Sequence, residues 1–402
     1  MLDDPRVDSL VFSGPPLPYP KTDRQSEFVA LANTLARVAA ANADRHDREN
    51  SFPFDTLETL REAGYFALVV PEVYGGRGAS PIETMLAQGQ LARGDGSVAL
   101  GTTMHHLSIV NIASSAHWPE HLKSLVLRDV VENGALINGV ASEPEMGSPS
   151  RGGMYATRAE RVDGGWRING RKTWSTLSPA LTYALAQVSV EGGDGSTKRG
   201  LFLVPMNTPG IHIEETWDSL AMRSTGSHDV VFEDVLVPEG YRIHNAKDPS
   251  APEVTAWNLL GSSVYLGIAT AARDFAVHYC QNRKPTAMSG APVSELQTVQ
   301  HRIANIEMLL LQAQSVLYGT AELLEQCPEQ QAELAWRVAA AKYITTNNAI
   351  TITDLALRVV GATGLLKRHP LERYFRDVRA GLGNPPMDDV ALTIIGKAAL
   401  AK

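Results

Sequence analysis

The chain has 402 residues, which is enough for two or three domains, each with a buried core. It carries 36 Lys and Arg residues against 44 Asp and Glu residues, and the resulting charge of −8 argues against a nucleic-acid-binding protein, which would normally be basic. With 44% hydrophobic and 20% charged residues, the composition predicts a packed globular protein rather than a disordered one.

The cysteines and the N-terminal sequence predict the cellular setting. Cys280 and Cys327 lack a Cys-x-x-Cys partner, so we expect neither a disulfide framework nor a zinc site or other metal centre. The chain begins with acidic residues and prolines, where a signal peptide would have a basic and then an apolar region. No run of about 18 apolar residues occurs, so we expect no membrane span and a cytoplasmic location.

The first part of the chain, residues 1–136, is predicted to be an all-α domain. Phe28, Leu31, Leu35 and Val38 are spaced three or four residues apart, as on the buried face of an amphipathic helix. Helical patterning continues to residue 136. It is interrupted by Gly64, at a position typical of a helix C-cap, and by an ordered loop at 71–78.

The middle part, residues 137–245, changes to short β-type runs. These runs lie at 154–162, 166–168, 182–190, 201–204, 211–216 and 230–237. Turn pairs such as Asn169-Gly170 and Pro209-Gly210 separate them. Because no helical segment crosses between the runs, they predict a central antiparallel β-barrel or sheet and argue against a doubly wound nucleotide-binding fold.

The last part, residues 246–402, is predicted to be a four-helix bundle. Helical segments lie at about 262–283, 295–326 and 332–360, with a fourth beyond Asp388. Leu296, Ile303, Leu310 and Leu317 follow the spacing of a helix that is packed along its whole length. The predicted fold class is therefore α+β with three domains: helices, a sheet and a helical bundle.

Four motifs at the joints of this arrangement, taken in order, resemble the acyl-CoA dehydrogenase superfamily of FAD-dependent enzymes. They are Pro71–Gly78, Gly139–Ser148, Asn169–Thr176 and Met222–Val235. The third motif is similar to the family's Gly-x-Lys-x-Trp-Ile-Thr. The second lies where the family has Thr-Glu-Pro followed by Gly-Ser-Asp. The resemblance covers nearly the whole chain and implies an FAD cofactor, a small-molecule substrate such as an acyl-CoA, and hydride transfer from the acyl thioester to flavin N5.

A flavin needs an apolar or aromatic wall against its ring and hydrogen-bond partners at its polar edge. Trp174 and Thr176 lie two residues apart on a strand-like segment, so they can face the same side. The resemblance implies that Trp174 packs on the ring and that the Thr176 hydroxyl reaches N5. The alternative is that Trp174 is a buried core residue and Thr176 an ordinary strand residue.

The resemblance implies two further groups of cofactor contacts. Val140 and Ser142 would lie at the flavin, with Ser142 at its polar edge, and Ser148 would contact the phosphates or the thioester. Turn chemistry alone also explains the two serines. The second group would reach the FAD of a neighbouring subunit, which implies a homodimer or homotetramer. Its members are Arg283, Leu296, Gln297 and Gly361. Without the family pattern, Arg283 would be an ordinary cation near a helix C-terminus.

This sequence departs from the family pattern at several positions. The residue after Ser148 is Pro149 in place of Asp, and Leu357 and Val360 replace a glutamine and a glycine near Gly361.

The catalytic base of the family is missing from the sequence, so the catalytic residue stays unknown. Its usual position, nine residues after Arg376, is Pro385, and its alternative position is at or near Trp257. Neither side chain can remove a proton from a substrate. A position that contacts CoA in many family members is Asn258. The related flavin monooxygenases need no such Glu, but their catalytic histidine is here Asn384.

Two alternatives to a dehydrogenase therefore stay open. One is a flavin-dependent monooxygenase or oxidase acting on a non-CoA substrate. The other is an inactive family member that serves as a binding subunit. Asp388 and Asp389 are predicted to act as the N-cap and a first-turn acid of the last helix, and His105, His106 and His228 to be structural or surface residues. The electron acceptor cannot be read from the sequence.

Overall fold

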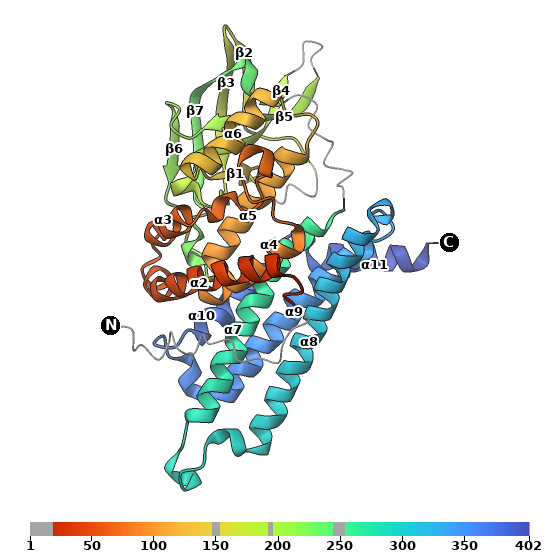
Figure 1. Cartoon of the computed structure of the whole chain (residues 1–402). Helices are drawn as coiled ribbons and strands as arrows, with labels where there is room; N and C mark the ends of the chain where they lie inside the picture. Colours follow the sequence, from red (N-terminus) through yellow and green to blue (C-terminus); the bar gives the residue numbers. More distant parts are fainter. Residues whose placement is uncertain (1–18, 147–152, 192–195, 244–253, 402) are drawn as a thin grey trace.

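The computed structural model describes residues 19–146, 153–191, 196–243 and 254–401 (Figure 1). It confirms the predicted fold class of N-terminal helices, a middle sheet and C-terminal helices. The N-terminal helices are α2 (Asp23–Glu49), α3 (Phe54–Glu62), α4 (Pro81–Gly94), α5 (Gly96–Ser114) and α6 (Glu120–Asn133). The helix ends follow local chemistry. Ser80 and Glu83 form a capping box at the start of α4, and Gly64 follows α3 with a φ of +67°, close to the predicted C-cap.

The middle domain is a single sheet that follows the order β6-β7-β3-β2-β4-β5-β8 and is open rather than closed into a barrel. The strands are β1 (Ile137–Val140), β2 (Arg158–Val162), β3 (Gly165–Lys172), β4 (Tyr183–Glu191), β5 (Thr197–Pro205), β6 (Ile211–Glu214), β7 (Asp229–Pro238) and β8 (Arg242–Ile243). Most neighbouring strands are antiparallel, as predicted, but β1 and β2 both pair with β4 in parallel. Both parallel pairings join strands that are not consecutive along the chain, since β2 and β3 lie between β1 and β4, and β3 lies between β2 and β4.

The two parallel strands share one edge of β4. Strand β1 pairs with Tyr183 to Ala186, and β2 pairs with Ser189 and Val190 further along the same strand. The chain therefore leaves the sheet after Val140 and returns to it at Arg158. We call this place, where β1 and β2 follow one another along the same edge of β4, the β1–β2 junction.

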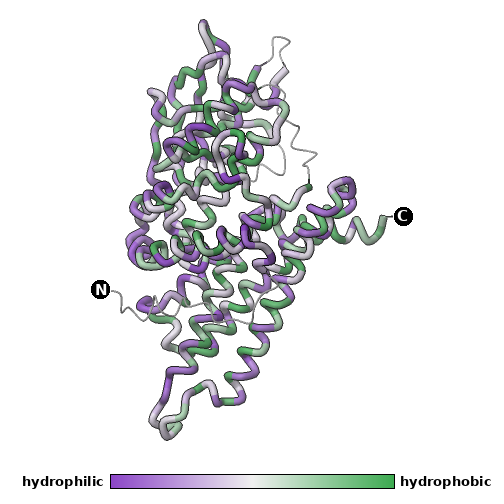
Figure 2. Tube along the Cα trace, viewed as in Figure 1, coloured by the Kyte–Doolittle hydropathy of each residue, from purple (hydrophilic) through white to green (hydrophobic). Residues whose placement is uncertain are grey.

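The C-terminal domain is built on three long helices, α7 (Leu260–Asn282), α8 (Gln297–Gln326) and α9 (Ala335–Val360). Two shorter helices follow, α10 (Leu371–Asp377) and α11 (Asp388–Leu400). Figure 1 shows α7, α8 and α9 side by side, running away from the sheet, with α11 packed on α9. Apolar and polar residues are interspersed along these helices (Figure 2). The buried residues of α8 recur every three or four positions, as at Ile306, Leu310, Ala313 and Leu317, which is why the 295–326 pattern could be read from the sequence.

Helix α4 joins the N-terminal domain to the bundle by packing directly on α7. The two helices approach so closely at Gly89 and Gly267 that a Cβ atom on Gly267 would lie 2.1 Å from the backbone oxygen of Gly89. Side chains at this crossing would therefore push the two domains apart.

We expect Gly267→Ala to lower the free energy of unfolding by about 1–3 kcal/mol, because the added methyl group meets backbone that cannot rotate away. Urea unfolding of the purified protein measures the change. Gly319→Ala in α8 is the matched control, since its Cβ would have no atom within 4 Å. That change is expected to raise stability by up to about 1 kcal/mol through helix propensity. Equal effects of the two substitutions would contradict the packing argument.

Candidate functional site

The end of β3 lies beside the β1–β2 junction. Ser142 follows β1, and its backbone oxygen accepts a hydrogen bond of 2.9 Å from the backbone nitrogen of Thr173, just beyond β3. Asn138 of β1 donates through its side-chain nitrogen to the backbone oxygen of Thr176, at 3.0 Å. These bonds bring two of the sequence motifs, Gly139–Ser148 and Asn169–Thr176, side by side.

The segment from Trp174 to Thr176 is a turn, so the prediction that these residues lie on a strand is wrong. Strand β3 ends at Lys172, and Trp174 has a left-handed φ of +57°. The turn forms because its backbone bonds to the 225–228 segment instead of continuing a ladder: Ser175 donates to His228 at 3.2 Å and Leu177 donates to Thr225 at 2.9 Å. Alternation along a strand therefore does not decide where these side chains point.

Trp174 is 67% exposed, so the alternative that it is a buried core residue is also wrong. Its ring meets that of Trp217 edge to face, with ring centroids 5.0 Å apart. Trp217 is fixed in turn by its Nε1, which donates to the backbone oxygen of Met222 at 3.0 Å. A left-handed backbone is costly for a bulky residue, and such outliers gather at ligand sites. The arrangement offers an aromatic surface on a rigid support.

The hydroxyl group of Thr176 belongs to a short chain of hydroxyls. Its Oγ1 lies 2.9 Å from Oγ of Ser227, which lies 2.9 Å from Oγ1 of Thr225. Ser175, between Trp174 and Thr176, has a buried Oγ with no hydrogen-bond partner among the described residues. The turn thus offers an exposed aromatic face and the half-buried hydroxyl group of Thr176, which fit the ring and the polar edge of a flavin, whereas the Ser175 hydroxyl is enclosed by the protein.

The remaining residues of the first predicted group differ in how far they are buried. Ser142 is half-buried at the β1–β2 junction, where its backbone oxygen bonds to Thr173. The Val140 side chain is buried in the sheet core, so only its backbone can face a ligand. Ser148 and Pro149 lie outside the described residues. Sequence reasoning assigned no role to Trp217 or Ser227, although Ser227 falls within the quoted Met222–Val235 motif.

The second predicted group lies at the far end of the bundle. Arg283 ends α7, whereas Leu296 and Gln297 begin α8 (Figure 1). Gly361 follows α9 with a φ of +74° and belongs to the same end, because Arg302 of α8 donates to the backbone oxygen of Arg358 at 3.0 Å. Met222, which accepts the hydrogen bond from Trp217, lies near Ile268 in the middle of α7, because both side chains would contact a Cβ atom on Gly96. From Ile268 to Arg283 the helix rises about 22 Å. The two predicted groups therefore lie at different places along α7.

The positions expected for a catalytic base carry no carboxylate. Trp257 is half-buried against the core, and Asn258 is used as a cap, its Oδ1 accepting from the backbone nitrogen of Thr255 at 2.8 Å. Next to Pro385, the side-chain nitrogen of Asn384 donates to the phenol oxygen of Tyr265 at 2.6 Å. Burial raises the pKa of this phenol, so Tyr265 stays neutral. A neutral amide and phenol pair thus lies beside the expected base position.

The other ionisable candidates are held by structural contacts. Asp388 and Asp389 lie in the first turn of α11 as predicted, but the N-cap is Met387. Asp388 pairs with Lys342, with Oδ1 and Nζ 3.4 Å apart. His105 bonds through its two ring nitrogens to the backbone of Phe66 and Ile137, and burial lowers its pKa to about 4.

The two remaining histidines differ in their partners. His228 accepts a hydrogen bond from the backbone nitrogen of Trp217 at 3.0 Å, and burial lowers its pKa. His106 is fully buried. Its ring nitrogens have no partner in the described part of the chain, and burial holds its pKa well below the usual value.

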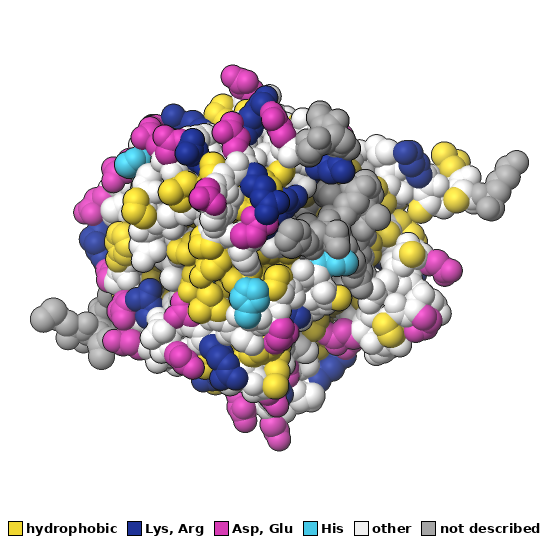
Figure 3. Space-filling view, turned by 90° about the horizontal axis from the view of Figure 1, so that it is seen from above, with side chains coloured by type: hydrophobic (Ala, Val, Ile, Leu, Met, Phe, Trp, Pro, Cys, Tyr) yellow, Lys and Arg dark blue, Asp and Glu magenta, His cyan; other side chains and the backbone are white. Residues whose placement is uncertain are grey.

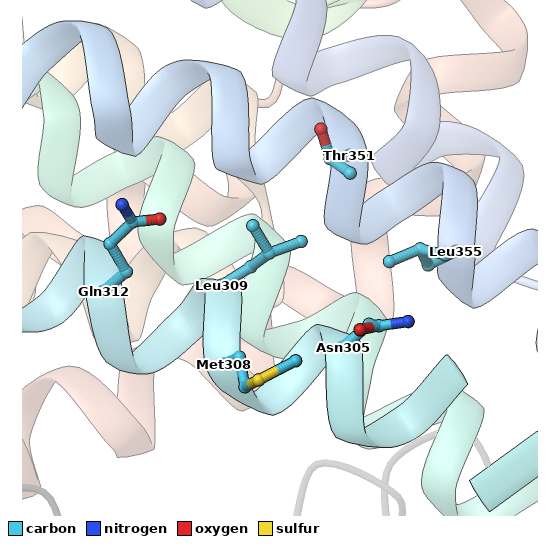
Figure 4. Close-up of a pocket in the computed structure, with 6 residues that line it drawn as sticks. All are labelled: Asn305, Met308, Leu309, Gln312, Thr351 and Leu355. Atoms are coloured by element: carbon cyan, nitrogen blue, oxygen red, sulfur yellow. The ribbon is translucent and has the colours of Figure 1, made fainter. Parts of the chain in front are cut away.

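A separate groove lies between α8 and α9 (Figure 4) and has a volume of about 550 Å³. Its lining residues are uncharged: Asn305, Met308, Leu309, Gln312, Thr351 and Leu355. It offers no acid or base for catalysis. On the face seen from the sheet end, acidic and basic side chains are interspersed around hydrophobic ones and form no basic patch (Figure 3). Among the described residues, no three His, Cys, Asp or Glu side chains are grouped as metal ligands, and no helix is both long and apolar enough to cross a membrane.

Comparisons with known proteins match the whole architecture. Family models for the N-terminal, middle and C-terminal domains of acyl-CoA dehydrogenase match residues 22–132, 139–235 and 259–383. The putative acyl-CoA dehydrogenase YdbM of Bacillus subtilis (strain 168) is 40% identical, over 92% of this chain and 96% of that protein. Benzylmalonyl-CoA dehydrogenase of Aromatoleum aromaticum is 29% identical, over 93% and 98% of the two chains.

A solved structure shares the same fold. The X-ray structure of KijD3 in complex with FMN and a dTDP-linked amino keto sugar has a TM-score of 0.83 and 24% identity, over 95% of each chain. In KijD3 this fold thus holds FMN together with a nucleotide-linked sugar. The three domain matches in order and the close relative YdbM lead to one conclusion: the chain belongs to the acyl-CoA dehydrogenase family.

Proposed function

We propose that the protein is a flavin-dependent oxidoreductase that binds FAD at the Trp174–Thr176 turn and oxidises an acyl thioester. The observation that carries the proposal is Trp174, an exposed indole held at a positive φ and supported by Trp217. An exposed aromatic side chain on strained backbone is explained when a second aromatic system covers it. The names of YdbM and benzylmalonyl-CoA dehydrogenase support a thioester substrate.

The chain's own residues have distinct tasks in this proposal. Trp174 forms the wall of the ring site, and Thr176 and Ser142 provide hydrogen-bond partners at its polar edge, with the Val140 backbone beside them. Bound flavin supplies the capacity to accept a hydride from the substrate. The protein keeps the ring fixed and excludes water from it.

We place the second group, Arg283, Leu296, Gln297 and Gly361, at the cofactor of a neighbouring subunit. Arg283 supplies a cation suited to a diphosphate, and Gly361 has a backbone conformation close to that reserved for glycine. Because α7 carries Arg283 about 22 Å beyond Ile268, which lies near Met222 of the sheet domain, we infer that a complete site requires at least a homodimer.

A second candidate function is a flavin monooxygenase or oxidase acting on a non-CoA substrate. The neutral Asn384 and Tyr265 pair beside the expected base position favours it, because a dehydrogenase needs a base for the substrate α-proton. KijD3, which binds FMN and an amino sugar, supports it as well.

One set of experiments separates the candidates. The purified protein is expected to be yellow, and anaerobic addition of acyl-CoA thioesters of different chain length is expected to bleach its visible absorption. Reduction only by an external reductant, followed by O₂ uptake with an amine or sulfur substrate, would favour the monooxygenase. A yellow protein that is inactive in both assays would indicate a binding subunit. A colourless protein that takes up neither FAD nor FMN would contradict both flavoenzyme candidates and favour a binding subunit.

A further inference from the structure

A buried ion pair connects the two sequence motifs, Gly139–Ser148 and Asn169–Thr176, that meet at the β1–β2 junction. The Lys172 Nζ lies 2.7 Å from the Glu143 Oε1, and the side chains are 0% and 2% exposed. Lys172 is the last residue of β3, and Glu143 follows Ser142 after β1. Two charged groups are rarely buried so completely unless they are well oriented and hydrogen bonds satisfy their remaining donors and acceptors.

The Glu143 carboxylate accepts hydrogen bonds from backbone groups as well as from Lys172. Its Oε2 accepts from the backbone nitrogen of Ala156 at 2.6 Å, and its Oε1 accepts from that of Thr157 at 3.0 Å. This one carboxylate, which follows β1, therefore bonds both to the end of β3 and to the residues that directly precede β2. These bonds, together with that from Lys172, lower the pKa of Glu143 against the opposing effect of burial.

Lys172 is equally enclosed. Its Nζ lies 4.2 Å from the centre of the Tyr155 ring, whose other contacts include Arg199, with its guanidinium carbon 5.4 Å from the ring centre. The titratable and charged groups near Lys172 are thus Glu143, the neutral phenol of Tyr155 before β2 and, beyond that ring, Arg199 of β5. Trp174 is only two residues beyond Lys172, and Ser142 directly precedes Glu143.

We propose that Glu143 and Lys172 are positioning residues for the flavin, and that their ion pair holds Ser142 and the Trp174 turn at the separation the ring requires. This inference rests on the proposed function, because it concerns the same site. It adds that flavin affinity and reactivity depend on two side chains that point into the protein. Neither residue is a catalytic residue in this proposal.

The test uses the full-length protein and its flavin dissociation constant. We expect Glu143→Gln and Lys172→Met each to raise this constant about tenfold or more, equivalent to about 1.4 kcal/mol. The double variant removes both charges, so no unpaired charge stays buried, and the introduced amide oxygen can still accept from one of the two backbone nitrogens, that of Ala156 or that of Thr157. It is therefore expected to fold even where a single variant does not. Its dissociation constant is expected to be raised less than the two single effects combined, because the two residues act as a pair.

The matched control is the exposed ion pair of the same sheet. Arg158 and Glu191 are 3.1 Å apart and 63% and 67% exposed, and they join β2 to β4. Arg158→Met and Glu191→Gln are expected to leave the flavin dissociation constant within twofold of the wild-type value.

A pH profile distinguishes positioning from a purely structural role. Burial lowers the pKa of Lys172 to about 8, against the raising effect of Glu143. Flavin binding is therefore expected to weaken between pH 7 and 9 as Lys172 loses its charge. In Lys172→Arg this weakening is expected to move to higher pH, because arginine stays charged.

The outcomes separate this inference from the proposed function. A wild-type protein that binds no flavin would overturn both. If the wild-type protein binds flavin, and the Glu143 and Lys172 variants lose thermal stability yet keep the wild-type flavin dissociation constant and pH profile, the inference is wrong and the proposed function stands.

Discussion

Trp174→Gly is expected to raise the flavin dissociation constant about 30-fold while leaving the apoprotein at least as stable as the wild type. The loss of binding reflects the apolar contact of the indole with a ring, on the order of 2 kcal/mol. The apoprotein loses little free energy of unfolding, because the indole is 67% exposed and buries little apolar surface. Glycine also adopts the φ of +57° at Trp174 without the cost of about 1–2 kcal/mol that a side chain incurs there.

Flavin titration of the apoprotein and its urea midpoint measure the two effects separately. Trp174→Phe is expected to recover part of the affinity, since it restores an aromatic face. The control is Trp336→Ala at the start of α9, where the indole contacts Arg337 and is not part of the proposed site. A Trp174→Gly protein that binds flavin as tightly as the wild type would show that the exposed indole serves another purpose.

Asp377→Asn is expected to remove a marked pH dependence of stability. Asp377 is 1% exposed and accepts a hydrogen bond of 2.7 Å from the backbone nitrogen of Met222, which ties α10 to the sheet domain. Burial raises its pKa to about 7, and the nearby carboxylates of Asp47 and Asp95 add to this effect. The Met222 bond and Arg373 act in the opposite direction.

Proton uptake by Asp377 decides whether the free energy of unfolding rises or falls with pH. Between about pH 4 and pH 7 the folded protein keeps a proton on Asp377 that the unfolded chain has released. Stability from this group is therefore fully present below about pH 4 and is lost as the pH rises towards 7. A shift of about three units corresponds to at most about 4 kcal/mol. Asparagine can still accept from Met222 but does not titrate, so the variant is expected to gain stability relative to the wild type as the pH rises.

Urea unfolding at pH 5, 6, 7 and 8 measures this difference, and comparison of variant with wild type cancels the titration of other groups. Asp354→Asn is the control, because Asp354 is an exposed carboxylate paired with Arg358 across one helical turn. It is expected to give a curve parallel to that of the wild type. A parallel curve for Asp377→Asn would mean that Asp377 is already ionised at pH 5.

The fold could be predicted from the sequence because its signals are local. The apolar period of Leu296 to Leu324 is enough to define a long packed helix, and Asn169-Gly170 and Pro209-Gly210 mark where strands change. The parallel pairing of β1 and β2 with β4 could not be predicted, since it depends on residues far apart in the chain.

The site was predictable only in part. The motif containing Trp174 and Thr176 led to the right neighbourhood, but alternation gave the wrong local structure. The 225–228 segment bends this stretch into a turn, and that contact spans about fifty residues. The partnership of Glu143 with Lys172 was likewise hidden, because a charged residue in a sequence motif does not reveal whether it will be buried. Which residue serves as base cannot be derived from positions that hold Pro385 and Trp257.

Helix α7 is a rigid element that leads from Ile268, beside the sheet domain, to Arg283 at the far end of the bundle. Its length is set by backbone hydrogen bonds, so no rotation of a side chain shortens it. In the proposed assembly, folding would make two half-sites per chain, and only association would make a working one. Two variants damaged in opposite halves would then restore one intact centre when mixed, and dilution alone would switch the protein off.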